Sequence, residues 1–509
     1  MDNILYYSLL VLLPLLLLFT ISKASCFGSR RQHHRHGLNL PPGPWQLPVI
    51  GSLHHLRGSL PHRALRDLSL RYGPLMFLKF GEVPVAVAST PDAAREIMKT
   101  HDAVFSTRPL SLTMKVITKN GAGIVWAPYG NHWRQLRKIC MMELLSTKRV
   151  QSFRRVREEE AARLVMAIST ATTPLVNLSK LLAVYVADAS VHAILGNRFK
   201  DRDTLLCFVD EAVELAGGST LVDLFPSSRL VRALGGRALR RAEVYRETVF
   251  AFMDGVIQDH LERRSRGEEA GRQEDLVDVL LRIQGEGNLQ FPLTMHIIEA
   301  VIFDLFGGGT ETATTTLQWA MAELMRKPDA MSKAQAEVRG VFMGQKKVTE
   351  ERLSELSYLH LVIKETLRLH TPGPLLMPRE CQEQCQIIGY DVPKGTMVLV
   401  NAWAISRNPE FWDAPDTFNP ERFQGDTRDF RGNDFDYIPF GAGRRICPGI
   451  AFGMANMELA LANLLFYFDW NLPEGVIPSE MDMTEAMGIT ARRKADLLLS
   501  ATLRVPLPN

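Results

Sequence analysis

The chain has 509 residues and a formal net charge of +3, and 46% of its residues are apolar while 23% are charged. This length allows one large catalytic domain or two ordinary ones, and the small net charge, with no basic tract rich in aromatic residues, excludes a nucleic-acid partner. The cysteines have no spacing typical of a disulfide framework or a zinc site, as suits a reducing compartment; they are Cys26, Cys140, Cys207, Cys381, Cys385 and Cys447.

The chain begins with an apolar run that predicts a membrane anchor. Ile4–Ile21 are eighteen uncharged residues, which as a helix would extend about 27 Å, close to the hydrocarbon thickness of a bilayer. Basic residues follow the run, so the positive-inside rule leaves the bulk of the chain in the cytosol. We therefore predict a single-pass anchor over residues 1–22, with a cleaved signal peptide as the alternative.

A basic and proline-rich linker is predicted over residues 23–44. It ends in Leu40-Pro41-Pro42-Gly43-Pro44, where the prolines fix φ and resist helix formation. Residues 45–509 show no internal repeat and no second domain boundary, so we expect one catalytic domain. Within it, Leu75–Val87 is rich in β-branched and aromatic residues and predicts a β-hairpin, whereas most of the remainder is predicted to be helical.

Three consecutive glycines stand inside one of the predicted helices. Phe306-Gly-Gly-Gly-Thr-Glu-Thr312 interrupts a helical run that resumes through Ala313–Met325. Each glycine in a helix costs about 1 kcal/mol relative to alanine, so the run predicts a local bulge with room for a small ligand near the backbone. Glu311 and Thr312 form an acid–alcohol pair that could organise proton transfer with water. The alternative is a helix–helix contact at small residues.

Two later segments contain an acid and two arginines. Glu365 and Arg368 are three residues apart, so they share a helix face and can pair. Arg422 follows in Pro420-Glu421-Arg422-Phe423. Taken alone, Glu-x-x-Arg is an ordinary surface pair.

Near the C-terminus a single cysteine stands in a loop of glycines and arginines, directly before a long apolar helical stretch. The loop is Phe440-Gly-Ala-Gly-Arg-Arg-Ile-Cys447-Pro-Gly449. A thiolate forms readily beside cationic side chains and a helix N-terminus, and we expect Arg444, Arg445 and the start of the helix to meet that need. The glycines permit positive φ and close approach of a flat macrocycle. The loop therefore predicts a thiolate metal ligand, with a free helix-capping cysteine as the alternative.

These segments resemble the cytochrome P-450 superfamily. The cysteine loop matches the haem-thiolate signature Phe-x-x-Gly-x-Arg-x-Cys-x-Gly at every fixed position, and the glycine-rich helix is similar to the oxygen-binding helix of the family, with Gly308 where alanine is commoner. The motif style resembles plant A-type microsomal members, which mostly oxidise specialised metabolites. The resemblance implies a mainly α fold with small β-sheets, in which haem lies between the oxygen-binding helix and the cysteine loop, behind an N-terminal transmembrane helix.

The resemblance also assigns roles to individual residues. Haem b is the implied cofactor and Cys447 its proximal iron ligand, while Glu311 and Thr312 are the implied catalytic residues. Glu365, Arg368 and Arg422 are expected to form a buried structural triad that fixes the haem-loop scaffold. The other implied cofactor-binding residues, of which the tryptophan and the arginines would meet the propionates, are Trp133, Arg137, Arg379, Arg445, Phe440, Gly308 and Gly309.

The same resemblance implies which windows surround the substrate, and they are mainly apolar, which favours a hydrophobic ligand. We expect a terpenoid first, with alkaloids and phenylpropanoids next. Asp304 lies four residues before Gly308 and therefore on the groove face, where it either anchors a substrate hydroxyl or serves helix packing. The expected pocket residues are Leu110, Met114, Ile124, Val301, Asp304, Leu375, Leu376, Met487 and Ile489.

The reaction that the resemblance implies is monooxygenation, in which a thiolate ligand favours O–O cleavage and one oxygen atom is inserted into a C–H bond. The chain has no dinucleotide fingerprint, flavin region or iron–sulfur cysteine set. An NADPH-cytochrome P-450 reductase at the endoplasmic reticulum membrane is therefore the implied electron donor, with cytochrome b5 as a second partner. We expect the donor to dock near Cys447, on a basic surface formed by Arg134, Lys138, Lys148 and Arg149.

Two alternatives remain at this stage. One is a family member that rearranges or dehydrates its substrate without using dioxygen. The other is a haem-thiolate sensor that performs no catalysis.

Overall fold

The computed structural model describes residues 37–196, 202–217, 220–267 and 274–507. The predicted anchor, residues 1–22, and the linker as far as residue 36 lie outside the described residues. The end of the linker contacts the catalytic body, since the Phe77 N–H donates to the Pro42 carbonyl at 2.9 Å. A Cβ at Gly43 would lie 2.1 Å from the Phe77 carbonyl oxygen, so glycine permits this close approach.

Most of the described chain is helical, as predicted. The α-helices are α2 (Pro61–Tyr72), α3 (Pro91–Arg95), α4 (Leu112–Ile117), α5 (Asn131–Ile139), α6 (Thr147–Ser152), α7 (Arg154–Ser169), α8 (Leu178–Leu195), α9 (Arg202–Gly217), α10 (Leu221–Leu224), α11 (Arg229–Leu234), α12 (Gly236–Ser265), α13 (Leu276–Glu286), α14 (Met295–Arg326), α15 (Pro328–Val341), α16 (Ser357–Leu369), α17 (Ala402–Ile405) and α18 (Ile450–Tyr467). Shorter 3₁₀ or π segments are η1 (Leu53–Leu56), η2 (Glu96–Thr100), η3 (Cys140–Leu144), η4 (Glu350–Glu355), η5 (Pro420–Phe423), η6 (Gly443–Arg445) and η7 (Pro478–Glu480).

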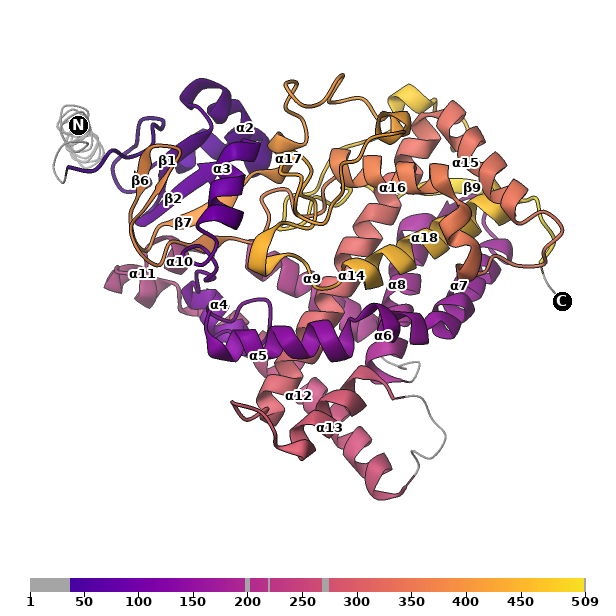
Figure 1. Ribbon diagram of the computed structural model, residues 1–509, viewed down its shortest axis with the longest axis horizontal. Helices are drawn as coiled ribbons and strands as arrows, with labels where there is room; N and C mark the ends of the chain where they lie inside the picture. Colours follow the sequence, from indigo (N-terminus) through magenta and orange to yellow (C-terminus); the bar gives the residue numbers. More distant parts are fainter. Residues whose placement is uncertain (1–36, 197–201, 218–219, 268–273, 508–509) are drawn as a thin grey trace, which may run out of the picture.

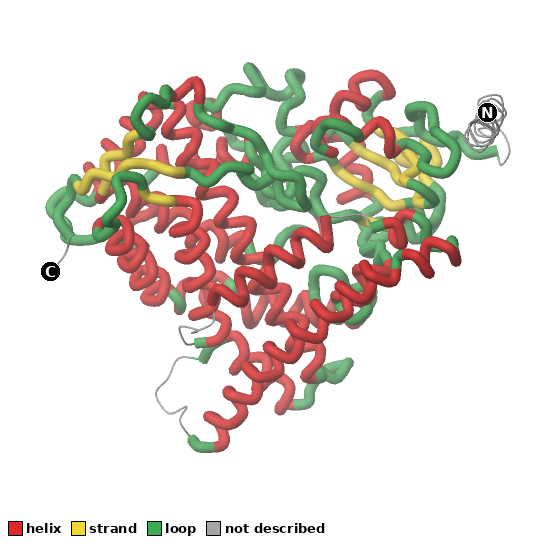
Figure 2. Tube along the Cα trace, turned by 180° about the vertical axis from the view of Figure 1, so that it is seen from behind, coloured by secondary structure: helices red, strands yellow, loops and turns green. Residues whose placement is uncertain are grey.

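The strands form three small sheets among the described residues. In the largest, β1 pairs antiparallel with β2, β2 pairs parallel with β7, and β7 pairs antiparallel with β4. The predicted hairpin is confirmed as β1 and β2, with Leu75 opposite Ala88. Figure 2 shows this sheet at one end of the molecule and the helices toward the other. The strands are β1 (Leu75–Phe80), β2 (Val83–Ala88), β3 (Val176–Asn177), β4 (Arg379–Glu380), β5 (Cys385–Ile387), β6 (Tyr390–Val392), β7 (Met397–Val400), β8 (Phe468–Asn471) and β9 (Leu498–Leu503).

The long helix α14 crosses the middle of the protein (Figure 1). It ends before Pro328, because a residue that precedes proline is disfavoured in the helical region. The bulge that the glycine run predicts is absent, since α14 continues unbroken through these residues. The hydroxyls of Thr310 and Thr312 donate to the carbonyls of Phe306 and Gly308 at 2.7 and 2.8 Å, so the polar side chains bond within the helix.

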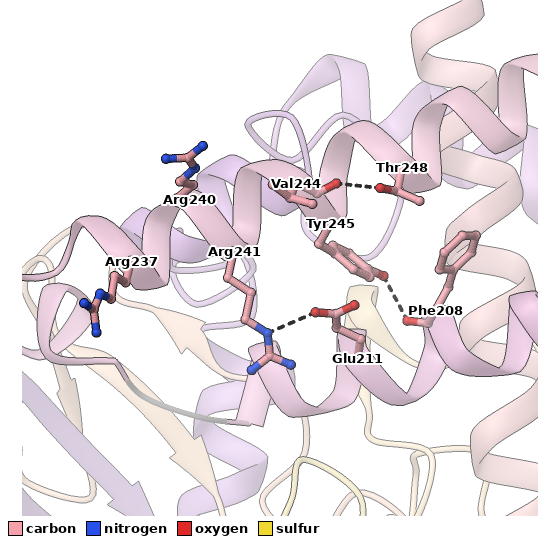
Figure 3. A pocket seen from close by; sticks show the side chains of 8 residues that line it. All are labelled: Phe208, Glu211, Arg237, Arg240, Arg241, Val244, Tyr245 and Thr248. Carbon is pink, nitrogen blue, oxygen red and sulfur yellow. Dashed lines mark hydrogen bonds and ion pairs between the residues drawn. The ribbon is translucent and has the colours of Figure 1, made fainter.

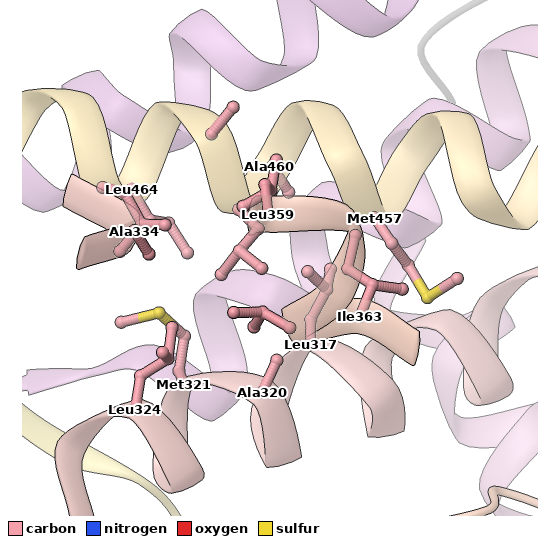
Figure 4. Packing of buried hydrophobic residues seen from close by; sticks show 14 of the residues in the cluster. Leu317, Ala320, Met321, Leu324, Ala334, Leu359, Ile363, Met457, Ala460 and Leu464 are labelled. Atoms are coloured by element: carbon pink, nitrogen blue, oxygen red, sulfur yellow. The ribbon is translucent and has the colours of Figure 1, made fainter. Parts of the chain in front are cut away.

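The main hydrophobic core lies between α14, α15, α16 and α18 (Figure 4). Leucine, alanine and methionine side chains from the four helices interlock there, and each fully buried leucine contributes about 1.5–3 kcal/mol to folding. This packing fixes α14 against α18, the helix that follows the cysteine loop. The residues shown include Leu317, Ala320, Met321, Leu324, Ala334, Leu359, Ile363, Met457, Ala460 and Leu464.

Two helices of the described chain, α8 and α18, are long and apolar enough to cross a membrane by length and composition. Within each apolar stretch, 72% and 67% of the residues are buried inside the protein. Both are therefore interpreted as core helices.

Candidate functional site

The cysteine loop is held in shape by its backbone. The Cys447 N–H donates to the Phe440 carbonyl at 3.0 Å, and Gly441 and Gly443 have φ values of +70° and +71°. A Cβ at Gly443 would lie 2.1 Å from the Met98 carbonyl oxygen, so only glycine fits there. The loop therefore presents a partly exposed Cys447 three residues before α18 begins.

The charges around Cys447 differ from those expected. Burial raises the pKa of its thiol, and the Gly449 N–H and the positive charge of Arg137 lower it only in part. Arg444 instead contacts Asp102 at 3.3 Å, and Arg445 donates to the Ser106 carbonyl at 2.8 Å. The expectation that these two arginines stabilise the thiolate is corrected: Arg137 of α5 acts on the sulfur, and a bound metal ion would displace the thiol proton.

The predicted propionate-binding residues come together beside this loop. Arg379 contacts Asp102 at 3.2 Å, and both side chains are 5% exposed. The Arg445 guanidinium lies 4.2 Å from the centre of the Trp133 ring. Arg137 has no hydrogen-bond or ion-pair partner among the residues that the structure describes, and burial lowers its pKa while Cys447 and Cys140 oppose that shift.

Arg108 also belongs to this cluster, although it was not among the residues predicted from the sequence. It is buried and donates to the carbonyls of Met377 and Pro378 at 2.7 and 2.9 Å, whereas its Nε has no partner in the described part of the chain. Burial, followed by repulsion from Arg379 and Arg445, holds its pKa well below the usual range. No local sequence signal marks Arg108, because the same segment also contains the cations Lys115 and Lys119.

These residues fit a haem group. Four guanidiniums lie close enough to influence the pKa of one another or of Cys447. They belong to Arg108, Arg137, Arg379 and Arg445. Asp102 is the carboxylate that Arg379 contacts. Burial lowers the pKa of Arg445 to about 9, and repulsion from Arg379 and Arg137 adds to the effect. Buried cations in excess are costly unless anions balance them, and two propionates would do so.

In that arrangement Cys447 would bind the iron, and the arginines and Trp133 would hold the propionates. When bound, haem with a thiolate ligand supplies activation of dioxygen.

The predicted catalytic pair lies on α14. Thr312 and Gly308 are one turn apart and both are exposed, although α14 crosses the middle of the protein. A Cβ at Gly308 would meet no atom within 4 Å, whereas one at Gly309 would meet Phe452 of α18 at 3.5 Å. Gly309 therefore faces α18 at ordinary contact distance, and Gly308 leaves open space beside the backbone. The Glu311 carboxylate accepts a hydrogen bond from the Thr490 hydroxyl at 2.7 Å.

The structure brings the predicted triad together in the core. Arg368 donates to both oxygens of Glu365 at 2.7 and 2.9 Å, and Arg422 donates to Oε1 at 2.9 Å. The side chains of Glu365 and Arg368 are fully buried. Arg368 also donates to the carbonyls of Ser406 and Pro415. The triad thus ties α16 to the chain that leads into the cysteine loop.

The predicted pocket residues are divided among several apolar clusters. Leu110, Met114, Ile124, Val301 and Ile489 belong to or pack against one cluster beside α14. Leu375 and Leu376 pack against the clusters around the largest sheet, and Leu376 adopts a φ of +51°, unusual for a bulky side chain. Met487 is 75% exposed.

Asp304 contacts the polypeptide loop that follows α4. Its carboxylate accepts a hydrogen bond from the Val125 N–H at 2.9 Å, and a Cβ at Gly123 would lie 2.1 Å from the same oxygen. Burial raises the pKa of Asp304 to about 7, although the N–H groups of Val125 and Ile124 favour the ionised form. Of the two roles expected for Asp304, the contacts favour holding this loop against α14.

Asp304→Asn is expected to change how stability depends on pH. Because the pKa of Asp304 is raised in the folded protein, that state binds more protons than the unfolded chain between about pH 4 and about pH 7, and stability falls as pH rises through this window. Asparagine keeps an acceptor for the Val125 N–H and removes the titration. The neighbouring Cys140 thiol, whose burial raises its pKa to about 12, stays neutral.

The measurement is the apparent unfolding temperature of Asp304→Asn at about pH 5 and about pH 8. We expect the variant to be more stable than the parent at the higher pH and to lose that advantage at the lower one. Asp254→Asn, at an exposed position on α12, is the control. An equal difference at both pH values would contradict the assignment.

A separate surface groove lies between α9 and α12 (Figure 3). It encloses about 370 Å³ and is lined by Phe208, Glu211, Arg237, Arg240, Arg241, Val244, Tyr245 and Thr248. Arg241 pairs with Glu211 at 3.0 Å and Tyr245 donates to the Phe208 carbonyl at 3.1 Å, whereas Arg237 and Arg240 point away from Glu211. None of the predicted site residues lines this groove, so we assign it no catalytic role.

Comparison with known proteins agrees with this geometry. The family model described as Cytochrome P-450 matches residues 41–499. Premnaspirodiene oxygenase from Hyoscyamus muticus is 48% identical over 91% of this chain and 92% of its own length, and desmethyl-deoxy-podophyllotoxin synthase from Sinopodophyllum hexandrum is 50% identical over 91% and 92%. Dolabradiene monooxygenase from Zea mays is 48% identical over 92% and 93%. A zebra fish cytochrome P-450 solved with progesterone has a TM-score of 0.75 and 25% identity, over 87% of this chain and 99% of that chain.

Proposed function

Because this chain belongs to the cytochrome P-450 family and is a monooxygenase, we propose that it hydroxylates a hydrophobic terpenoid, using dioxygen and electrons from an NADPH reductase. The observation that carries the substrate class is the apolar cluster beside α14, which includes Met114, Ile124 and Val301 and offers few directed polar contacts. Two relatives at 48% identity are named for the oxidation of dienes, premnaspirodiene and dolabradiene. Both features favour a hydrocarbon-rich substrate.

Each group of site residues has its own proposed role. Cys447 binds the haem iron, and Arg108, Arg137, Arg379, Arg445 and Trp133 hold the propionates. Thr312 and Glu311 would hold and pass protons, since a hydroxyl and a carboxylate can pass protons through water. The apolar residues orient the substrate and exclude water.

The test uses microsomes that contain the full-length chain and a plant reductase. They are incubated with NADPH and a panel of terpenoids, alkaloids and phenylpropanoids. We expect an NADPH-dependent product that carries one added oxygen from a terpenoid. Oxidation of only a phenylpropanoid or alkaloid would overturn the substrate class, and conversion without NADPH would favour the isomerase alternative.

Membrane attachment is part of the proposal, with residues 1–22 in the endoplasmic reticulum membrane and the catalytic domain in the cytosol. Large apolar side chains are exposed near the N-terminal end and on α10 and α11. The turn between β1 and β2 joins these regions, since the Gly81 N–H donates to the Ile50 carbonyl at 3.3 Å and the Glu82 N–H donates to the Leu224 carbonyl at 2.8 Å. The two regions lie on the same side of the molecule in Figure 1. Such a surface suits contact with lipid. The exposed residues are Trp45, Val49, Leu221, Leu230 and Leu234.

The reductase is proposed to dock on the surface formed by α5, η3 and the start of α6. Arg134, Lys138 and Lys148 are exposed there, whereas Arg149 lies 3.6 Å from Glu274 and contributes less. Met141 and Met142 are 42% and 60% exposed beside these cations. A basic rim around an apolar centre suits an acidic flavoprotein.

Thr312→Ala is expected to uncouple NADPH consumption from product formation. The Thr312 hydroxyl donates to the Gly308 carbonyl at 2.8 Å, and its oxygen can also accept a hydrogen bond from water. Without it, more of the reduced oxygen should leave as hydrogen peroxide, and product per NADPH should fall by about tenfold or more. The measurement is product, peroxide and NADPH in one reaction, with exposed Thr484→Val as the control. Unchanged coupling would remove Thr312 from the proton path.

A further inference from the structure

Glu311 is oriented by a loop that lies far from it in the sequence. Its side chain is 13% exposed, and its Oε1 accepts the hydrogen bond from the Thr490 hydroxyl at 2.7 Å. The Arg492 Nε lies 3.9 Å from the same oxygen. Oε1 therefore has two neighbours from one loop, and Oε2 has no hydrogen-bond partner among the described residues.

The loop that carries Thr490 is itself held on both sides. The Ala491 N–H donates to the Pro372 carbonyl at 2.9 Å, and the buried Trp319 indole N–H donates to the Ala491 carbonyl at 2.7 Å. Thr490 is 7% exposed. Because the residue next to Thr490 is fixed by two hydrogen bonds, the hydroxyl keeps a defined position relative to Glu311.

The same loop contacts α9. Arg492 pairs with Asp210 at 2.7 Å, and a Cβ at Gly217 would lie 2.9 Å from the Ile489 nitrogen. These contacts place the loop against α9, and the Arg492–Asp210 pair is partly exposed, at 33% and 63%. The Arg492 guanidinium supplies a positive charge beside the Glu311 carboxylate.

We propose that Thr490 and Arg492 are positioning residues for proton delivery by Glu311. The Thr490 hydroxyl occupies Oε1, so Oε2 is the oxygen that takes a proton from water and passes it on toward Thr312, after which the carboxylate is regenerated. Arg492 places a positive charge 3.9 Å from Oε1, on the side away from Oε2. The inference rests on the proposed function, in which Glu311 carries protons.

The test compares Thr490→Val, which keeps the shape and loses the hydroxyl, with Thr490→Ser, which keeps the hydroxyl. We expect Thr490→Val to lower product per NADPH by at least about threefold, since one oriented hydrogen bond is lost, and to raise the solvent isotope effect. Thr490→Ser should restore both values. Thr484→Val, at an exposed position of the preceding segment, should behave as the parent.

A second measurement does not depend on turnover. In the reduced carbon monoxide complex, the infrared C–O stretch responds to nearby polar groups. We expect Thr490→Val to shift or broaden this band because the Glu311 carboxylate is released, and Thr490→Ser to leave it unchanged. Equal effects of the valine and serine variants would show that Thr490 acts by packing and would overturn the proposal.

Glu311→Gln separates this inference from the proposed function. If Glu311→Gln uncouples the reaction and Thr490→Val does not, the proton role of Glu311 stands and the positioning role of Thr490 is overturned. If neither variant uncouples the reaction, Glu311 does not carry protons, and that part of the proposed function is overturned. The proposal expects Thr490→Val to add no further loss of coupling in the Glu311→Gln background, because both act through the same carboxylate.

Discussion

Cys447→Ser is expected to eliminate the thiolate-type band of the reduced carbon monoxide spectrum and to lower the rate of monooxygenation by more than about 100-fold. Mutation of a residue that only hydrogen-bonds a metal ligand commonly lowers activity 10–100-fold, so loss of the ligand itself should cost more. The structure gives the reason for this sensitivity. Cys447 is held by its backbone bond to Phe440 and by glycines with positive φ. A serine hydroxyl in that place is a harder and weaker ligand, and it does not supply the electron donation that favours O–O cleavage.

Cys207→Ser provides the matched control, because Cys207 is an exposed free cysteine on α9. It should bind haem and turn over as the parent does. Haem content is measured in each variant, so that loss of the cofactor is separated from loss of the ligand type. A thiolate-type band in haem-loaded Cys447→Ser would show that another residue binds the iron.

Glu365→Gln is expected to cost about 3–5 kcal/mol of stability, the usual effect of removing one partner from a buried ion pair. Glu365 balances two guanidiniums, those of Arg368 and Arg422, and also accepts the Asn419 N–H at 2.9 Å. The neutral amide leaves both cations without a counter-charge in the core. The variant should unfold at a clearly lower temperature and recover with little haem.

The chain contains a good control for this change. Glu355 pairs with Arg352 at 2.7 Å with the same spacing of three residues, but the two side chains are 48% and 33% exposed. Because exposed pairs contribute about 0–1 kcal/mol, Glu355→Gln should leave the unfolding temperature nearly unchanged. If the two variants were equally stable, the triad would not support the scaffold as we describe.

Much of the fold could be predicted from local patterns. The hairpin of β1 and β2 follows from a segment rich in β-branched and aromatic residues, and the cysteine loop from its fixed glycines and arginine. One local inference was wrong: the glycine run does not interrupt α14, because the helix is supported by the core on both sides of the run. Tertiary packing outweighed the low helix propensity of glycine.

The contacts that orient the site could not be read from local patterns. The Asp304–Val125 and Glu311–Thr490 bonds each join residues 179 positions apart, and neither leaves a periodic signal. Arg108 was missed for a related reason, since an arginine in a loop becomes informative only when Arg379 and Arg445 are seen beside it. Long-range polar contacts of this kind require the folded structure.

The central claim is that this chain inserts one atom of dioxygen into a hydrophobic substrate at a haem held by Cys447. The most direct measurement is the mass of the product formed by microsomes with NADPH under ¹⁸O₂, for the terpenoid that the panel identifies. We expect the product to gain one ¹⁸O atom and Cys447→Ser to form none of it. A product whose added oxygen comes from water, or a product formed equally without dioxygen, would contradict the claim.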